Sequence, residues 1–170
     1  MDLDPEFAVS LFWDAQNAQL LSHQICNLMA NIESSLRTAD ERYYLAKKKV
    51  VVGNSSLDFI SQHGEYLHQQ GFVVVDAPEQ ERDCIIERAF DAGNIILDEI
   101  LGQVLEKELS RNVLIISGKS DFITTLKMLE SNERNTLIAV DEDASPDYIG
   151  TAQHAWLWDD MATRAAKFIH

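Results

Sequence analysis

The sequence has few cysteines, few basic residues and no long hydrophobic run. Cys26 and Cys84 are its only cysteines, and neither they nor the five histidines have the spacing of a zinc site. We therefore expect two reduced, buried thiols. No apolar run approaches the ~20 residues that a membrane-spanning helix needs, and the acidic start MDLDPEF does not resemble a secretory leader. These absences predict a cytoplasmic protein with no membrane partner.

Acidic residues outnumber basic residues. The chain has 28 Asp and Glu residues against 14 Lys and Arg residues, a net charge of −14. Tight nucleic-acid binding normally depends on a basic surface, so we expect none through bulk charge. The one dense basic run, Lys47–Lys49, is interpreted as a solvated segment before a strand. Carboxylates can nevertheless act on nucleic acid through the metal ions that they bind.

Short apolar runs alternate with segments of helical periodicity along the 170 residues, which suits one domain. Apolar runs of this length are typical of parallel strands buried on both faces, and helices between them suit crossover connections. The pattern predicts a three-layer α/β/α sandwich with a mainly parallel sheet. The expected strands are 8–13, 49–54, 72–77, 113–117, 136–140 and 155–158; the expected helices are 18–36, 56–70, a region 79–109 broken near Gly93 and Asn94, 120–131 and a terminal helix.

Polar side chains stand where the expected strands end. In open parallel sheets, ligands bind beyond the carboxyl ends of the strands, at a switch in strand order. Asp14 ends the first strand and Asn17 follows it, while Ser117 ends the fourth strand and leads into Asp121. The other acids near strand ends are Asp76, Asp141 and Asp143, with Asp98 and Glu99 on the helix before the fourth strand. Several carboxylates are thus expected at one edge of the sheet.

Carboxylates crowded at one edge predict a site for a hard cation. Like charges raise one another's pKa unless a cation joins them, and oxygen ligands favour Mg²⁺ or Mn²⁺. Each acid taken alone also has a structural explanation. Asp121 suits the first turn of a helix, Asp141 suits a turn, and Asp98 suits an exposed helix face. Asp14 and Asp121 together, at the ends of two core strands, are the hardest to explain structurally.

The tryptophans do not identify a function. Trp13 is expected in the core, next to the acid. Trp156 and Trp158 alternate in an apolar run, which predicts one buried and one exposed ring. The amphipathic terminal segment DDMATRAAKFIH is expected to pack on the sheet or to form a homodimer.

Two motifs carry a resemblance to a known family. SLFWDAQN (10–17), together with LIISGKSDF (114–122), resembles the NYN domain family of PIN-like ribonucleases. In that family a hydrophobic strand runs into Asp-x-x-Asn, and a later strand runs into Ser-Gly-Asp-x-Asp-Phe. The nearest variety is the FWDxxN type of cyanobacteria and of some eukaryotic RNA regulators. Over residues 8–160, the resemblance implies a PIN-like fold and a metal-dependent endoribonuclease that hydrolyses RNA, single-stranded or in a structured loop.

The resemblance also implies roles for individual residues. Asp14 would be the first metal ligand and Asp121 the second, with Mg²⁺ or Mn²⁺ as the cofactor. Asn17 would support Asp14 or contact a phosphate. Ser117 and Ser120 would position a phosphate or a metal-bound water. The metal would polarise the phosphoryl oxygen and supply the nucleophile.

The sequence departs from the family at two positions. Lys119 stands where the family usually has an acid, and it would oppose a cation or contact a phosphate directly. Asn94 stands where members often carry an Asp, for which Asp98 or Glu99 would substitute. Two alternatives therefore remain open. One is a weakened or inactive NYN domain that binds RNA or a protein; the other is a haloacid-dehalogenase-like phosphatase, although Gln16 stands where such phosphatases need a second acid.

Overall fold

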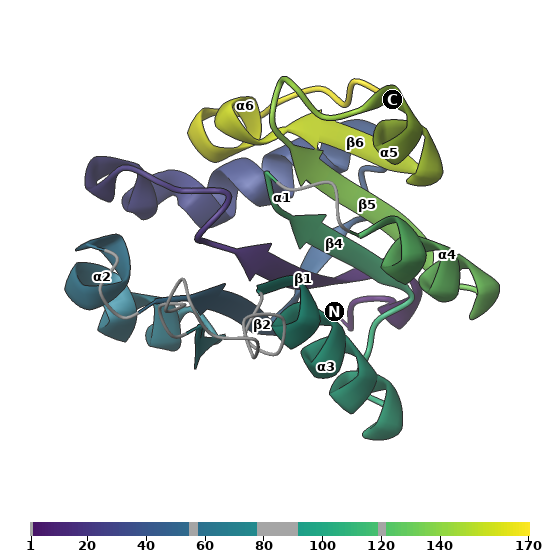
Figure 1. Ribbon diagram of the computed structural model, residues 1–170, viewed down its shortest axis with the longest axis horizontal. Helices are drawn as coiled ribbons and strands as arrows, with labels where there is room; N and C mark the ends of the chain where they lie inside the picture. The colour runs from purple at the N-terminus through teal and green to yellow at the C-terminus, as the bar shows by residue number, and fades with distance from the viewer. Residues whose placement is uncertain (1, 55–57, 78–91, 119–121) are drawn as a thin grey trace, which may run out of the picture.

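A six-stranded parallel sheet forms the centre of the molecule. The computed structural model describes residues 2–54, 58–77, 92–118 and 122–170. The strands run in the order β3-β2-β1-β4-β5-β6, and every neighbouring pair is parallel. This confirms the predicted sandwich with its parallel sheet (Figure 1). The strands are β1 Ala8–Asp14, β2 Tyr44–Gly53, β3 Phe72–Asp76, β4 Asn112–Ile116, β5 Asn135–Val140 and β6 His154–Leu157.

Helices cover both faces of the sheet (Figure 1). One face carries α1 (Leu28–Ala39), α2 (Asp58–Gln69) and α6 (Trp158–Thr163). The other face carries α3 (Ala92–Leu105), α4 (Ile123–Ser131) and α5 (Pro146–Thr151). Two short 3₁₀ helices, η1 (Pro5–Phe7) and η2 (Ser22–Asn27), flank β1. Within these described ranges, no helix is long and apolar enough to cross a membrane.

Alternation along β1 supplies both apolar cores. Leu11 and Trp13 pack in the core on the α1 side, whereas Phe12 packs in the core on the α3 side. All three side chains are fully buried. Because successive residues of a strand point to opposite faces, a strand covered on both faces needs an unbroken apolar sequence.

The strand order changes direction beside β1. From β1 the chain proceeds outward through β2 and β3, and β4 then lies on the other side of β1. In open parallel sheets, ligands bind at such a switch point, beyond the carboxyl ends of the strands. The residues that follow β1 and β4 therefore lie at the expected ligand position.

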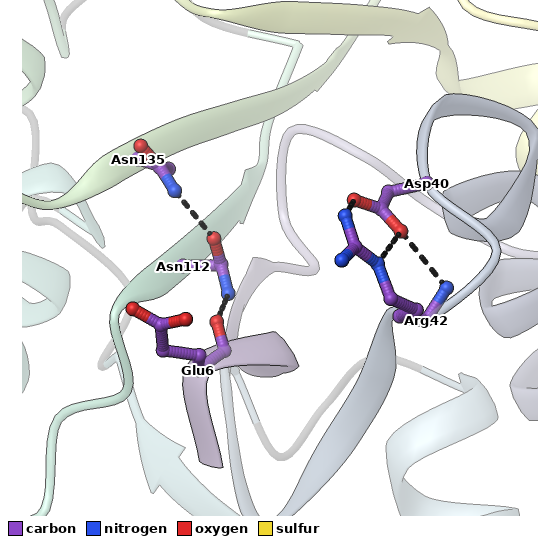
Figure 2. A network of polar contacts seen from close by, with 5 residues as sticks. All are labelled: Glu6, Asp40, Arg42, Asn112 and Asn135. Atoms are coloured by element: carbon purple, nitrogen blue, oxygen red, sulfur yellow. Dashed lines mark hydrogen bonds and ion pairs between the residues drawn. The ribbon is translucent and has the colours of Figure 1, made fainter. Parts of the chain in front are cut away.

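At the opposite, amino edge of the sheet, side-chain amides join neighbouring strands. Asn112 Nδ2 donates to the Glu6 carbonyl (2.8 Å), and Asn135 Nδ2 donates to Asn112 Oδ1 (2.8 Å), as Figure 2 shows. Before β2, the Arg42 guanidinium donates two hydrogen bonds to the Asp40 carboxylate and lowers the pKa of that carboxyl. These polar contacts have a structural role far from the switch point.

The helix predicted over 18–36 begins later than expected. η2 occupies 22–27, and the α-helix begins at Leu28. The carbonyls of Ala18 and Gln19 accept hydrogen bonds from tryptophan indoles instead of from a following helical turn. Leu20 and Ile25 are buried all the same. Apolar spacing therefore predicted their burial correctly and their backbone conformation wrongly.

The basic run lies within β2, whereas it was predicted to precede the strand. Lys47 and Lys48 are exposed, in agreement with the interpretation as a solvated segment, whereas Lys49 is buried. β2 begins at Tyr44 because Tyr44 and Leu45 pair with the start of β1. Lys49 is only 9% exposed, and its Nζ donates to the carbonyls of Lys47 (3.2 Å) and Gln70 (2.8 Å). Burial lowers the pKa of Lys49. The lysine thus joins the end of α2 to the sheet.

α5 lies between the expected strands 136–140 and 155–158, where no helix was predicted. Ser145 precedes the helix, and its Oγ accepts a hydrogen bond from the Tyr148 N–H (3.2 Å). Pro146 occupies the first helical position. Serine at the N-cap followed by proline is a recognised start of a helix, so the sequence does contain this signal.

Other predictions fail or fall outside the described residues. Trp156 and Trp158 are both buried, because β6 ends at Leu157 and Trp158 begins α6. Cys26 is exposed, contrary to the prediction of a buried thiol. α3 begins at Ala92 and has Gly93 and Asn94 in its first turn, so the break predicted near these residues stays a prediction, because residues 78–91 lie outside the described ranges. Three further predictions lie outside the described residues: the buried thiol of Cys84, the first residues of the helices expected at 56–70 and 120–131, and the start of the helical region 79–109.

Candidate functional site

Asp14 is the last residue of β1 and stands at the switch point. Its side chain is 1% exposed, and in the β1–β2 register it pairs with Val52. On the other side of β1, Trp13 pairs with Ile116, the last residue of β4. Ser117, which follows Ile116, therefore reaches the sheet edge beside Asp14, as parallel strands require.

The carboxylate of Asp14 is oriented by donors from both sides of the switch point. Ser117 Oγ donates to Asp14 Oδ2 at 2.7 Å. Asn17 Nδ2 donates to the same oxygen at 2.8 Å, and the Asn17 backbone N–H donates to Oδ1 at 3.3 Å. Hydrogen bonds to a charged acceptor are stronger than neutral ones. Asn17 and Ser117 thus orient the carboxylate of Asp14.

Gly118 closes the turn after β4 against the loop after β1. Its N–H donates to the carbonyl of Asn17 at 2.9 Å. A side chain at position 118 would collide with that carbonyl and with the carboxylate of Asp141. The close approach therefore requires glycine, and it places Asp141 at the same corner as Asn17 and Ser117.

Asp141 follows β5, next to β4 in the sheet. Burial raises the pKa of Asp141, and repulsion from Asp143 and Asp159 raises it further. Its carboxylate thus carries charge at an electrostatic cost that a nearby cation would relieve. Asp141 was one of several strand-end acids in the sequence; the approach to Gly118 singles it out.

Three candidate site residues, Asn94, Asp98 and Glu99, lie on α3, which leads away from this corner. α3 leads into the amino end of β4, so its first turn points toward the carboxyl edge. Asn94 lies in that first turn, and Asp98 lies one turn, ~5.4 Å, farther from the edge; both are exposed.

Glu99 lies within electrostatic range of Lys48, in the amino half of β2. The pKa of Lys48 is raised by its hydrogen bond with Glu108 and, more weakly, by the charges of Glu106 and Glu99. Lys48 precedes Val52, the partner of Asp14, by about 13 Å of strand. No contact joins Glu99 to Asp14 in the described parts of the chain.

Lys119, Ser120 and Asp121 lie outside the residues that the structure describes. Among the residues that it does describe, no three acidic, histidine or cysteine side chains form a group that could hold a metal ion. The atoms at the corner that could coordinate a metal are carboxylate, hydroxyl and amide oxygens, the ligand types that Mg²⁺ and Mn²⁺ prefer. The chemistry of Asp14, Asp141 and Ser117 therefore fits a hard divalent cation.

Comparison with known proteins agrees with the fold and supplies the family. A crystal structure of a protein of unknown function from Vibrio parahaemolyticus has a similar fold, with a TM-score of 0.64 and 18% identity over 95% of this chain and 98% of that chain. No curated protein is significantly similar to the chain. The NYN domain model matches residues 8–156, a span that includes Asp14, Asn17 and Ser117. The chain therefore belongs to the NYN domain family, a family of PIN-like nucleases.

Proposed function

We propose that the protein is a divalent-cation-dependent endoribonuclease that hydrolyses single-stranded RNA at the carboxyl edge between β1 and β4. The observation that carries the proposal is the environment of Asp14. It is buried at the switch point and accepts three hydrogen bonds from Asn17 and Ser117. Burying a carboxylate is costly, and a carboxylate retained at a ligand position is characteristic of a site that binds charge.

Three carboxylates are the proposed cation ligands. Asp14 and Asp141 come from the described corner, and Asp121 belongs to the sequence between β4 and α4. Asp98 on α3 forms no metal-binding group with Asp14 and Asp141 in the described residues and is proposed as a further catalytic acid. Mg²⁺ or Mn²⁺ is the proposed ion, because the donors are all oxygen. Once bound, such a cation supplies Lewis-acid stabilisation of the charge that develops on the phosphate.

Other side chains of the chain position these groups and the substrate. Asn17 and Ser117 keep the Asp14 carboxylate in one orientation. In our proposal Lys119, Ser120 and Asn94 contact the RNA phosphate, for which a lysine ammonium is a suitable partner. The lysine that replaces the family's acid thus contributes to substrate binding instead of cation binding.

The rest of the surface offers little to a polyanion. The net charge is −14, and many exposed cations are paired with carboxylates. Those pairs are Arg37–Glu33, Arg42–Asp40, Lys48–Glu108, Arg111–Glu6 and Arg164–Asp160. RNA affinity should therefore come mainly from the candidate site and depend on the divalent cation.

A cytoplasmic location and a homodimer stay predictions.

A second candidate is an NYN domain that has lost catalysis and kept binding. Lys119 and Asn94, which replace two acids of the family pattern, favour it. Membership of the NYN family leaves the haloacid-dehalogenase-like phosphatase without support.

Cleavage of an end-labelled single-stranded RNA separates the two candidates. Purified protein is incubated with Mn²⁺ or Mg²⁺, beside an EDTA control and the variants Asp14→Asn and Asp98→Asn. Asp147→Asn, which removes an exposed acid on α5, is the matched control. We expect metal-dependent cutting that Asp147→Asn retains and Asp14→Asn loses. Well-folded protein that binds the RNA and cuts it with neither metal would establish the binding-only candidate.

A further inference from the structure

We propose that Trp158 is a positioning residue for the candidate site, acting through Asn17 on Asp14. The inference rests on the proposed function. Trp158 begins α6 directly after β6, the last strand of the sheet, and its side chain is 2% exposed. Its indole Nε1 donates to the carbonyl of Gln19 at 3.0 Å. A residue from one border of the sheet thus binds the loop that follows β1.

A second indole binds the same loop at the preceding carbonyl. Trp13 Nε1 donates to the Ala18 carbonyl at 2.8 Å. The rings of Trp13 and Trp158 contact each other, with centroids 5.6 Å apart and planes at 47°. The hydrogen bond of Trp13 is buried and therefore shielded from competing water, and that of Trp158 is partly buried. Two consecutive carbonyls of the loop are therefore held by a packed pair of indoles.

These carbonyls immediately follow the residue that orients the catalytic candidate. Asn17 donates two hydrogen bonds to Asp14, and its own carbonyl accepts from the Gly118 N–H. The Ala18 N–H returns to the Asp14 carbonyl at 2.9 Å. Residues 14 to 19 thus form one hydrogen-bonded turn, and Trp158 fixes its far end. Releasing Gln19 would loosen Asn17 and, with it, the Asp14 carboxylate.

Trp158 has no direct contact with Asp14 among the interactions of the described residues. Its effect on the site is therefore one of geometry, transmitted by the turn. Loss of the Trp158 indole N–H as a donor to the turn should weaken cation binding about three- to tenfold. This factor corresponds to the net free energy of one hydrogen bond. It should lower kcat more than it raises KM, because the ligand's orientation changes while the RNA contacts remain.

The test compares Trp158→Phe with Trp156→Phe. Trp156 is a matched control: it is also fully buried, and its Nε1 donates to the Ala166 carbonyl at 3.1 Å, away from the β1 loop. Amide hydrogen exchange of Ala18 and Gly118 is followed by NMR in metal-free protein. Free Mn²⁺ is followed by electron paramagnetic resonance in a titration. We expect Trp158→Phe alone to accelerate both amides and to weaken Mn²⁺ binding, although both variants lose thermal stability.

A double variant tests whether Trp158 acts on Mn²⁺ binding through Asn17. In Asn17→Ala protein, Trp158→Phe should change the Mn²⁺ affinity no further, because the connecting side chain is already gone. Unchanged exchange at Ala18 and Gly118 in Trp158→Phe, or equal effects of the two tryptophan variants on Mn²⁺ binding, would overturn the inference. If the wild type binds no Mn²⁺, the proposed function fails, while the exchange rates still decide whether Trp158 positions the turn.

Discussion

Ser117 Oγ lies 2.7 Å from Asp14 Oδ2, a hydrogen bond between residues 103 positions apart in the sequence. It joins the carboxyl ends of β1 and β4, the two strands on either side of the switch point. The bond is buried, so water cannot readily replace the hydroxyl donor. The hydrogen bond thus ties the orientation of the site's central acid to the pairing of the two central strands.

Ser117→Ala should therefore destabilise the protein and weaken the site together. The substitution leaves a buried carboxylate oxygen one donor short, which costs about 1–3 kcal/mol. Ser10→Ala is the control, because Ser10 is an equally buried serine of β1 that accepts from the Ser110 N–H at the other end of the strand. Urea unfolding and Mn²⁺ titration of both variants check this. Equal Mn²⁺ affinities in the two variants would contradict the role given to Ser117.

Gly118→Ala should disrupt the corner, because the new methyl group would collide with the Asn17 carbonyl and the Asp141 carboxylate. Gly102→Ala is a fitting contrast: position 102 lies in α3 with nothing within 4 Å of the added carbon. Alanine within a helix is favoured over glycine by up to ~1 kcal/mol. We expect thermal melting to show a lower Tm for Gly118→Ala and an unchanged or higher Tm for Gly102→Ala. The reverse order would mean that the turn tolerates a side chain.

The raised pKa of Asp141 makes a prediction about pH. Burial holds this pKa above its ordinary value of 3.8, so the folded protein binds more protons than the unfolded chain between the two values. Stability therefore falls as the pH rises through that interval. In metal-free buffer, Asp141→Asn should have a higher Tm than the wild type at neutral pH, and the difference should vanish as the pH falls below 3.8.

Glu142→Gln removes the same charge from an exposed neighbour and should show no comparable gain. Adding Mn²⁺ should raise the Tm of the wild type more than that of Asp141→Asn, since the cation binds the charged carboxylate. A stabilising effect of Asp141→Asn that persists unchanged at low pH would exclude the electrostatic explanation.

Lys49→Met should destabilise the protein more than Lys48→Met. Lys49 Nζ donates to two backbone carbonyls, and removing it leaves partly buried acceptors without that donor, a loss of about 1–3 kcal/mol. Lys48 makes an exposed ion pair with Glu108 at 3.1 Å, the type of contact that contributes about 0–1 kcal/mol. Urea unfolding midpoints of the two variants decide the point, and equal losses would show that the contacts of Lys49 add nothing.

The sheet was predictable because its signal is local. β1, β4, β5 and the carboxyl half of β2 are apolar runs buried on both faces, so their burial follows from residues adjacent in the sequence. The edge strand β3 is an equally apolar run, yet its Val73 and Val74 are exposed. Asp14 and Ser117 were likewise predictable as residues at strand ends, where the fold binds ligands. Their direct hydrogen bond could not be predicted, because it requires β1 and β4 to be neighbours in the sheet. No single segment of the sequence determines the order of the strands.

Predictions failed where tertiary contacts override a local pattern. Leu20 and Ile25 have helical spacing, yet indole donors from Trp13 and Trp158 hold the preceding carbonyls in a loop. Lys49 is charged, yet it is buried, because its ammonium donates to two backbone carbonyls that replace water. Asp141 became a leading candidate only through its approach to Gly118.

Locating a bound Mn²⁺ ion by anomalous X-ray diffraction tests the central claim most directly. Crystals of the wild type and of Asp14→Asn would be soaked in the same Mn²⁺ solution. Our account predicts a peak within about 2.5 Å of the Asp14 carboxylate, at the corner with Asp141, and none there in Asp14→Asn. A Mn²⁺ peak that avoids this corner in the wild type, or that is unchanged in Asp14→Asn, would contradict it.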